Sequence, residues 1–172
     1  MEAIRETHLP EQYLTFWVGG EEYAIGILRV REIIEYPAVT RVPNSPPWIR
    51  GVINLRGSVV PVIDLAVKLG FEFAPATRRT CIVLVEVELE GELTVLGVVA
   101  DGVGQVLELA PADIEPSPSF GTRVHTHYLT GMGKVERGFV LLLDIDRALA
   151  RSEVLEAAAA SAGETAESEL TA

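Results

Sequence analysis

The hydrophobic residues of this chain recur mainly at every second position, in runs that glycine interrupts. The run YLTFWVGGEEYAIGILRV (residues 13–30) has apolar stretches on both sides of Gly19-Gly20, and CIVLVEVELEGELTVLGVVADGV (residues 81–103) turns near Glu90-Gly91. A period of two is that of a β-strand, and a short glycine-containing break between two such runs is typical of a β-hairpin. We therefore expect a mainly β protein with two hairpins and only short helices.

The second hairpin is expected to be buried at its base and exposed to solvent at its tip. Residues Ile82 to Val85 are apolar on both faces, whereas the tip carries glutamates at alternate positions: Glu86, Glu88, Glu90 and Glu92. This spacing favours a solvated hairpin tip over the paired carboxylates of a hydrolase.

The segments after the two hairpins indicate an internal duplication. Val30–Glu35 follows the first hairpin and Val103–Glu108 follows the second, so that Glu32 of the first half corresponds to Gln105 of the second. Each half then passes through a proline-rich loop to a glycine, an Arg-Gly pair, an apolar strand and an aspartate that can cap a short helix. The first half has Gly51, Arg56-Gly57 and Asp64, and the second has Gly131, Arg137-Gly138 and Asp144. Two similar lobes of about five strands each, closed so that no edge is exposed, are expected.

Two further expectations concern this repeated segment. PPWIRGVINL (residues 46–55) is predicted to form a short helical turn, because proline is tolerated at a helix start. Pro61 fits an edge or bulge position, because proline cannot donate to a β-ladder.

Length, charge and cysteine content limit the class of protein. The 172 residues suit one domain or two small lobes, and the net charge of −11 opposes attraction to nucleic acid or to an anionic membrane. The lone Cys81 excludes an internal disulfide, and we find no signal peptide or apolar run of about 18 residues. We expect a cytoplasmic protein with a flexible segment at 1–11, a folded body at 12–152 and an acidic tail at 153–172 that is partly helical or disordered.

Enzymatic and metal-binding interpretations find little support in the residues. Asp101-Gly102-Val103-Gly104 resembles part of a histidine-kinase ATP site, but no Walker loop or other phosphate-binding motif accompanies it. His125 and His127 share a face if extended, yet no third ligand follows at a convincing spacing. Cys81 has no evident activating base. We expect no cofactor, no metal and no catalytic residue, and a small ligand-binding or enzymatic β-barrel remains the alternative class.

Four segments resemble the CheW family of chemotaxis coupling proteins. They are LRVREIIEY, VPNSPPWIRGVINLRGSVVPVIDL, VADGVGQVLEL and YLTGMGKVERGFVLLLDIDRAL, and the resemblance covers residues 12–150. It implies two five-stranded SH3-like β-barrels that share a hydrophobic interface, and no enzymatic activity. It also implies docking onto the cytoplasmic tip of methyl-accepting chemoreceptors and onto the regulatory domain of the histidine kinase CheA, in arrays at the membrane. An adaptor of another two-component pathway, such as surface motility, is the alternative.

The resemblance also assigns binding positions, which we state as expectations. Receptor binding is carried over to a groove between the barrels, at Val30, Glu32, Gly51, Arg56 and Val106. Glu32 and Arg56 are expected to form a bidentate pair that leaves donors for a partner. Kinase binding is carried over to Thr80 and Cys81 at a barrel end. Core packing remains the competing interpretation for Val30, Val106 and Cys81.

Overall fold

Strands make up most of the computed structural model, which describes residues 9–89, 91–116 and 128–149. The helical elements are short, as expected from the sequence. In chain order the elements are β1 (Glu11–Val18), β2 (Glu21–Gly26), the 3-10 helix η1 (Ile27–Arg29), β3 (Val30–Glu35), β4 (Ile49–Leu55), β5 (Ser58–Ile63), α2 (Leu65–Lys68), β6 (Cys81–Leu89), β7 (Glu92–Ala100), β8 (Gly102–Leu109), the 3-10 helix η2 (Pro111–Asp113), β9 (Ile114–Glu115), β10 (Leu129–Val135), β11 (Gly138–Leu143) and α3 (Ile145–Ala148).

The two predicted hairpins are present, as β1–β2 and β6–β7. Gly19 and Gly20 both adopt positive φ, at 60° and 84°, and Gly91 adopts 81°. Two-residue turns of this kind match the twist of the strands that they join, and glycine enters them without strain. At the base of the second hairpin, Ile82 through Val85 are all buried, as predicted.

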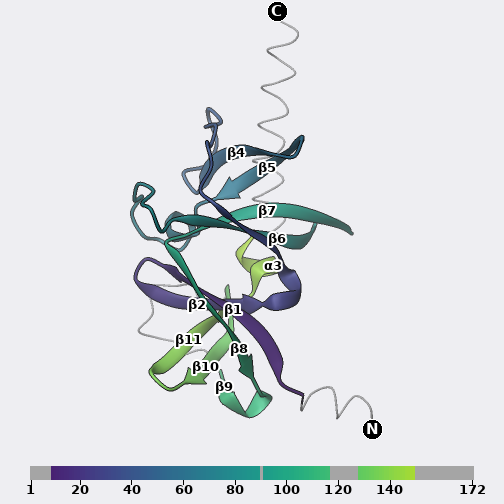
Figure 1. Ribbon diagram of the computed structural model, residues 1–172, viewed down its shortest axis with the longest axis vertical. Coiled ribbons are helices and arrows are strands. Elements are labelled where there is room, and N and C mark those ends of the chain that lie inside the picture. Colours follow the sequence, from purple (N-terminus) through teal and green to yellow (C-terminus); the bar gives the residue numbers. More distant parts are fainter. Residues whose placement is uncertain (1–8, 90, 117–127, 150–172) are drawn as a thin grey trace, which may run out of the picture.

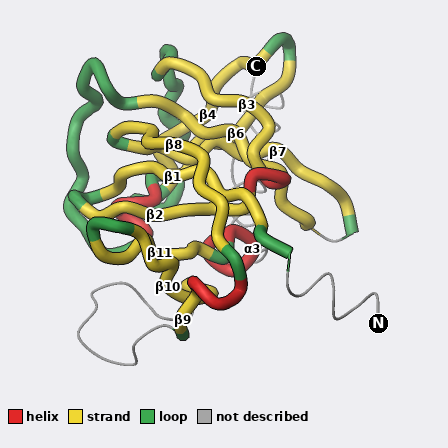
Figure 2. Tube along the Cα trace, turned by 60° about the horizontal axis from the view of Figure 1, so that its bottom comes forward, coloured by secondary structure: helices red, strands yellow, loops and turns green. Residues whose placement is uncertain are grey.

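The strands form two sheets, each of which defines one lobe (Figure 1). Lobe A has the order β8-β1-β2-β11-β10-β9 and lobe B has the order β3-β6-β7-β5-β4. Figure 2 shows the strands of lobe A following one another in this order, with lobe B behind them. The prediction of a mainly β protein with two lobes is confirmed.

The lobes exchange hairpins, so the two lobes do not coincide with the two halves of the sequence. Hairpin β1–β2 lies in lobe A with the later strands of the second half, and hairpin β6–β7 lies in lobe B with β3, β4 and β5. Two short parallel pairings join the halves, β5 with β7 and β11 with β2. Val106 therefore lies in lobe A, and Cys81 lies in lobe B.

Both lobes close in the same way. In lobe B, Thr40 and Val52 exchange two backbone hydrogen bonds of 2.9 and 2.8 Å, which link the segment after β3 to β4. In lobe A the short strand β9 pairs with β10 at Met132, the position that corresponds to Val52. Closure of this kind removes free sheet edges.

Three apolar clusters fill the structure. The largest draws side chains from both sheets and from the helices, and we call it the interlobe core; it includes Phe16, Tyr23, Leu65, Val85 and Leu149. Smaller clusters fill the inside of lobe B, around Leu84, and the inside of lobe A, around Leu142. The shared hydrophobic interface expected between the lobes is thus the main core of the molecule.

The predicted helix caps are confirmed, and two neighbouring predictions are corrected. The carboxylates of Asp64 and Asp144 accept hydrogen bonds from the third helical residue of α2 and α3, at 3.2 and 3.1 Å. The segment from Pro46 makes only a turn, closed by a bond from Ile49 N to Pro46 O, and then continues as strand β4. Pro61 lies in β5, which is not an edge strand, just before the residues that pair with β7.

Strand pairing also corrects the alignment of the repeats. The strand patterns match eighty residues apart, so that Gly51 corresponds to Gly131 and Asp64 to Asp144, but Arg56 corresponds to Glu136 and not to Arg137. Strands β3 and β8 are also equivalent. Glu32 of β3 lies opposite Leu84 of β6, and the residue of β8 that corresponds to Glu32 is Leu107, which lies opposite Tyr13 of β1. Gln105 falls at a β-bulge instead, where strand spacing along the sequence no longer predicts the register.

Some predictions concern residues outside the described ranges. They are the histidine pair His125 and His127, most of the flexible segment 1–11 and the acidic tail 153–172. Strand β1 begins at Glu11, at the predicted border of the folded body.

Candidate protein-docking surface

Glu32 and Arg56 form the bidentate pair that the family resemblance implied. The two guanidinium nitrogens Nη1 and Nη2 of Arg56 donate to Oε1 and Oε2 of Glu32, at 3.3 and 2.9 Å. The pair joins β3, the strand at one edge of the sheet of lobe B, to the turn between β4 and β5 at the opposite edge. It therefore spans the mouth of this lobe, and 72% of the Arg56 side chain is still exposed to solvent.

The backbone of Arg56 presents its side chain outward from a tight turn. Arg56 has φ of 49° and Gly57 has φ of 90°, so both central residues of the two-residue turn are left-handed. The Gly57 amide donates to the Asn54 side-chain oxygen at 2.8 Å, which holds the turn. A non-glycine residue at positive φ is uncommon, and such strain is concentrated at functional sites.

The pair stabilises the charges of both residues. The hydrogen bond from Arg56 is the main cause that lowers the pKa of Glu32 below its usual value, and the same bond raises the pKa of Arg56. Both groups are therefore fully charged at neutral pH. A partner that approaches Arg56 meets a guanidinium whose orientation is already fixed on one side.

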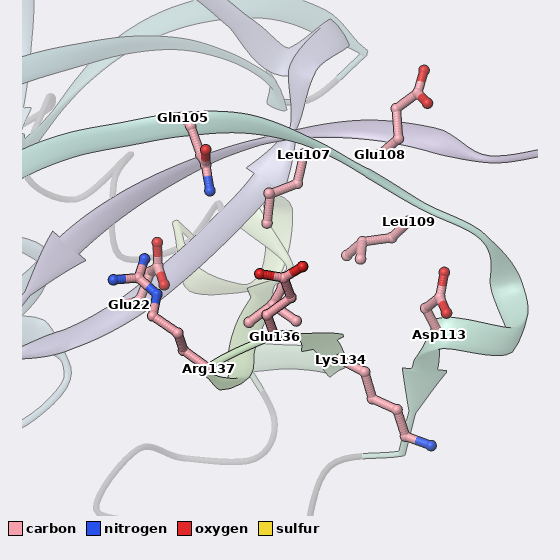
Figure 3. Close-up of a pocket in the computed structure, with 10 residues that line it drawn as sticks. Glu22, Gln105, Leu107, Glu108, Leu109, Asp113, Lys134, Glu136 and Arg137 are labelled. Carbon is pink, nitrogen blue, oxygen red and sulfur yellow. The ribbon is translucent and has the colours of Figure 1, made fainter.

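The equivalent place in lobe A has no such pair. There the counterparts are Leu107 and Glu136, and a cavity of about 470 Å³ opens between β8 and the β10–β11 turn (Figure 3). Figure 3 shows Leu107 and Leu109 extending from β8 toward this cavity, with Glu136, Arg137 and Lys134 across it. The arginine–glutamate pair thus distinguishes lobe B from lobe A.

Val30 and Val106 occupy equivalent positions on the two sheets. Val30 lies opposite Val85 and Val106 lies opposite Leu14, and both of these partners belong to the interlobe core. Val30 is half-buried against that core, whereas Val106 is 50% exposed. Core packing thus explains Val30 in part, and Val106 remains available for contact.

The expected single groove is divided by a bulge in β3. The register of β3 shifts between Val30 and Glu32, which lie opposite the adjacent residues Val85 and Leu84. Adjacent strand residues face opposite sides of a sheet, so Val30 faces the interlobe core and Glu32 faces the inside of lobe B. The structure brings Glu32 and Arg56 together, and it sets the two valines on the other face.

Gly51 has a structural reason to be glycine. A Cβ atom there would lie 2.2 Å from the carbonyl oxygen of Thr40, the residue whose backbone closes lobe B, and φ is 150°. Gly131 repeats the arrangement, because its Cβ would lie 2.7 Å from the carbonyl oxygen of Glu115. Gly51 thus permits the close approach of two backbone segments, whatever else it contacts.

Thr80 and Cys81 lie at the start of β6, away from the Glu32–Arg56 pair. The Thr80 side chain is 7% exposed, and its hydroxyl accepts a bond of 2.7 Å from the Thr77 amide. Cys81 is half-buried against the interlobe core, and burial, with a smaller contribution from Asp101, raises the pKa of its thiol. An inert thiol results, consistent with the packing interpretation.

Sequence reasoning missed a buried arginine near this end of lobe B. The Arg50 guanidinium pairs with the buried carboxylate of Asp64 at 3.0 Å, and it stacks on Phe73 with 4.5 Å to the ring centroid. Its Nη2 also donates to the carbonyl oxygen of Ala74 at 3.1 Å. The only signal in the sequence was a basic residue inside an apolar strand, which does not identify a partner.

Within the described ranges, acidic, histidine and cysteine side chains form no group that could hold a metal ion. In the same part of the chain, none of the helices combines the length and the apolar content that crossing a bilayer requires.

Comparison with known proteins agrees with this architecture. Residues 12–153 match the family model of the CheW-like domain. The chain belongs to the CheW family. It is 40% identical over 144 residues to the chemotaxis protein CheW of Klebsiella aerogenes, and this match covers 84% of each chain. It is 30% identical over 142 residues to a probable chemotaxis protein CheW of Rhizobium etli, and this match covers 83% of this chain and 89% of the relative.

A solved CheW structure shows the same fold. The crystal structure of the scaffolding protein TtCheW from Thermoanaerobacter tengcongensis aligns with a TM-score of 0.71 at 28% identity, over 80% of this chain and 86% of that one. The resemblance predicted from the sequence is confirmed at the level of the CheW family and of its two-lobed β fold.

Proposed function

We propose that this protein is a chemotaxis adaptor that couples the cytoplasmic tips of methyl-accepting chemoreceptors to the histidine kinase CheA. The proposal rests on membership of a family whose relatives are chemotaxis and scaffolding proteins. It requires no chemical step: the protein supplies binding surfaces, and the receptor biases the state of the kinase held in the same complex. The protein would act in the cytoplasm, where it is recruited to receptor arrays.

The observation that carries the receptor assignment is the exposed bidentate Glu32–Arg56 pair. Two nitrogens of the guanidinium are bonded to Glu32, and 72% of the Arg56 side chain is exposed to solvent. A helical receptor tip that offers a carboxylate or a carbonyl oxygen would bind this guanidinium, and the half-exposed Val106 would be a separate apolar contact on lobe A. Val30 and Gly51 would contribute through the packing that holds β3 and β4 in place.

We assign the kinase to the start of β6, at Thr80 and Cys81. Because the Thr80 side chain is buried and bonded to Thr77, contact there would use its backbone and the exposed part of Cys81. The two partners would then bind at separate places on lobe B, which permits both to be bound at once.

The test compares Arg56→Glu, Glu32→Arg and the double exchange Glu32→Arg/Arg56→Glu. Binding of each variant to a receptor cytoplasmic fragment and to the CheA regulatory domain is measured by calorimetry. Arg56→Glu is expected to lose receptor binding by at least about tenfold and to retain kinase binding, because a contact with a charged group is worth about 1.5–3 kcal/mol. The double exchange restores the pair with inverted polarity, and it is expected to remain defective for the receptor.

The double exchange separates recognition from local structure. Recovery of receptor binding in that variant would mean that the pair only holds the β4–β5 turn against β3. Equal loss of both partners in Arg56→Glu, with loss of the cooperative unfolding transition, would likewise contradict a recognition role for Arg56.

A further inference from the structure

A cavity of about 360 Å³ opens beside the buried Arg50, at the end of lobe B where helix α2 begins. Its lining comes from the segment after β3, from the start of β4 and from the residues on either side of α2: Tyr36, Val39, Arg41, Pro47, Ile49, Arg50, Asp64 and Phe73. The volume is near the lower limit of the roughly 300–1,000 Å³ that is usual for ligand pockets. It is large enough to receive a side chain of another protein.

Arg50 lies in the wall of this cavity with one hydrogen-bond donor unused. Its side chain is only 11% exposed, and its Nε and Nη2 atoms lie 3.2 and 3.0 Å from Oδ2 of Asp64. Nη2 also donates to the Ala74 carbonyl oxygen. Nη1 makes one bond to the described residues, a long one of 3.4 Å to the Tyr36 hydroxyl. Because a guanidinium carries five N–H groups, one N–H of Nη1 has no acceptor in this part of the chain.

The charges around the cavity favour an anion. The lining has two arginines and one aspartate, which gives one net positive charge on a chain whose net charge is −11. Asp64 has no further capacity to compensate Arg41, because its two oxygens are bonded to Arg50 and to the Val67 amide. Arg41 is exposed and forms no ion pair with the residues that the structure describes. A carboxylate that enters the cavity therefore meets two guanidinium groups, which form strong charge-assisted hydrogen bonds.

Two aromatic rings fix the guanidinium of Arg50. Its central carbon lies 4.5 Å from the ring centroid of Phe73 and 5.6 Å from that of Tyr36. An arginine held in this way loses little side-chain freedom when a partner binds. Phe73 is 62% exposed, so it also offers apolar surface next to the charge. The site is thus suited to an acidic side chain that has an apolar neighbour.

The cavity adjoins the surface that we assign to the kinase. Cys81 lies opposite Glu35 in the sheet, and the next residue after Glu35, Tyr36, lines the cavity. Strand β4 begins at the cavity and ends next to the turn that carries Arg56. The cavity is therefore located with the kinase residues and away from the receptor residues.

We propose that this cavity binds an acidic side chain of the CheA regulatory domain, an aspartate or a glutamate with an apolar neighbour. The carboxylate accepts the unused Nη1 donor of Arg50 and pairs with Arg41, while the apolar neighbour lies on Phe73. The choice of the kinase as partner rests on the proposed function, whereas the preference for a carboxylate rests on the lining of the cavity. Arg41 and Arg50 would then determine which surface of the kinase can dock at this end of lobe B.

The test compares Arg41→Glu with Arg137→Glu, which makes the same change of charge at an exposed arginine of lobe A. Binding of the full-length variants to the CheA regulatory domain and to a receptor cytoplasmic fragment is measured by calorimetry. Arg41→Glu is expected to weaken kinase binding at least about tenfold, because like charges across an interface repel, and to leave receptor binding within about twofold. Arg137→Glu should leave kinase binding within about twofold.

Two further variants test the contact itself. Arg50→Lys keeps the charge beside Asp64 but loses the planar fork, so it should weaken kinase binding at least about threefold and still unfold cooperatively in urea. In addition, the surface aspartates and glutamates of the regulatory domain are replaced one at a time by lysine. One lysine variant should bind Arg41→Glu at least about fivefold more tightly than the natural regulatory domain does, with no such gain for Arg137→Glu.

The outcomes separate this proposal from the adaptor function. If the natural protein failed to bind the regulatory domain, the proposed function itself would be contradicted. If it bound, the cavity proposal would be overturned by normal kinase binding of Arg41→Glu, by equal losses in Arg41→Glu and Arg137→Glu, or by the absence of a rescuing lysine variant. Normal kinase binding of Arg41→Glu, together with saturable binding of free glutamate by the natural protein alone, would assign the cavity to a small carboxylate instead.

Discussion

Tyr23 is a fully buried residue with a hydroxyl group that its surroundings do not satisfy. Its ring stacks on Phe16 at a centroid distance of 6.2 Å inside the interlobe core, and its hydroxyl has no hydrogen-bond partner in the described part of the chain. A buried polar group without a partner costs free energy, whereas the ring itself stabilises the core. The phenol is thus retained at a cost that the ring alone would avoid.

Replacing Tyr23 by phenylalanine should therefore do no harm to the fold. We expect the free energy of unfolding of Tyr23→Phe, measured by urea titration, to stay unchanged or rise by up to about 1 kcal/mol. The matched control is Thr15→Val, at a buried hydroxyl that accepts a 2.8 Å bond from the Gln105 amide. That control should lose about 1 kcal/mol, since it removes the acceptor of this part-buried hydrogen bond. A loss in Tyr23→Phe as large as in Thr15→Val would show that the Tyr23 hydroxyl has a partner.

In alkaline solution, the free energies of unfolding of Tyr23→Phe and of the natural protein should depend differently on pH. Burial raises the pKa of Tyr23 to about 12, above the value of 10 in the unfolded chain. Between these values the unfolded state releases a proton that the folded state retains, so the free energy of unfolding falls as pH rises from about 10 to 12. Urea titrations across this range should show a smaller decrease for Tyr23→Phe than for the natural protein, and equal slopes would contradict the assignment.

At the scale of single elements, the closure of each lobe depends on one glycine. We expect Gly51→Ala to lower the free energy of unfolding by about 2 kcal/mol or more, because the new Cβ would collide with Thr40 and the backbone is left-handed there. Gly131→Ala should cost less, as its closest contact is longer and no positive φ adds strain.

Gly26→Ala is the matched control for these variants. Gly26 has φ of −57° and open space around the Cβ position, so alanine should be neutral or slightly stabilising in the same urea titration. If Gly51→Ala proved as stable as Gly26→Ala yet bound no receptor, Gly51 would be a contact residue and not a structural one.

Local features of these elements could be predicted from the sequence because their causes are local. The turn at Gly19-Gly20 and the caps by Asp64 and Asp144 depend on residues within four positions of one another. The match of Glu32 with Gln105 was wrong because both strands carry bulges at different places, and one bulge shifts every later residue. The match of Arg56 with Arg137 was wrong because the turn before β11 carries its glycine one residue later, at Gly138.

At the scale of the whole molecule, the exchange of hairpins could not be predicted. The two pairings that fix it, β5 with β7 and β11 with β2, involve only two residue pairs each and join distant parts of the chain. Apolar periodicity shows that a strand exists but not which strand it pairs with. The Glu32–Arg56 pair was predicted only through family resemblance, since 24 positions separate the two residues.

The exchange implies that neither half of the chain can fold alone. Residues 1–78 contain hairpin β1–β2 without its neighbours β8 and β11, and residues 79–172 contain hairpin β6–β7 without β3 and β5. We expect each fragment to show no cooperative thermal transition by circular dichroism. Mixing the two fragments should restore a cooperative transition, because together they supply both complete sheets. A well-dispersed amide NMR spectrum from either fragment alone would contradict this expectation.

The order of strands also determines what happens while the protein is being synthesised. Hairpin β1–β2 leaves the ribosome first, but its parallel neighbour β11 begins only at Gly138. At translation rates of about 5–20 residues per second, the apolar side chains of this hairpin wait on the order of ten seconds for their final neighbour. Lobe B is completed earlier, when β7 emerges. The nascent chain thus passes through a stage in which all five strands of lobe B have been synthesised while the first hairpin still lacks its neighbour β11.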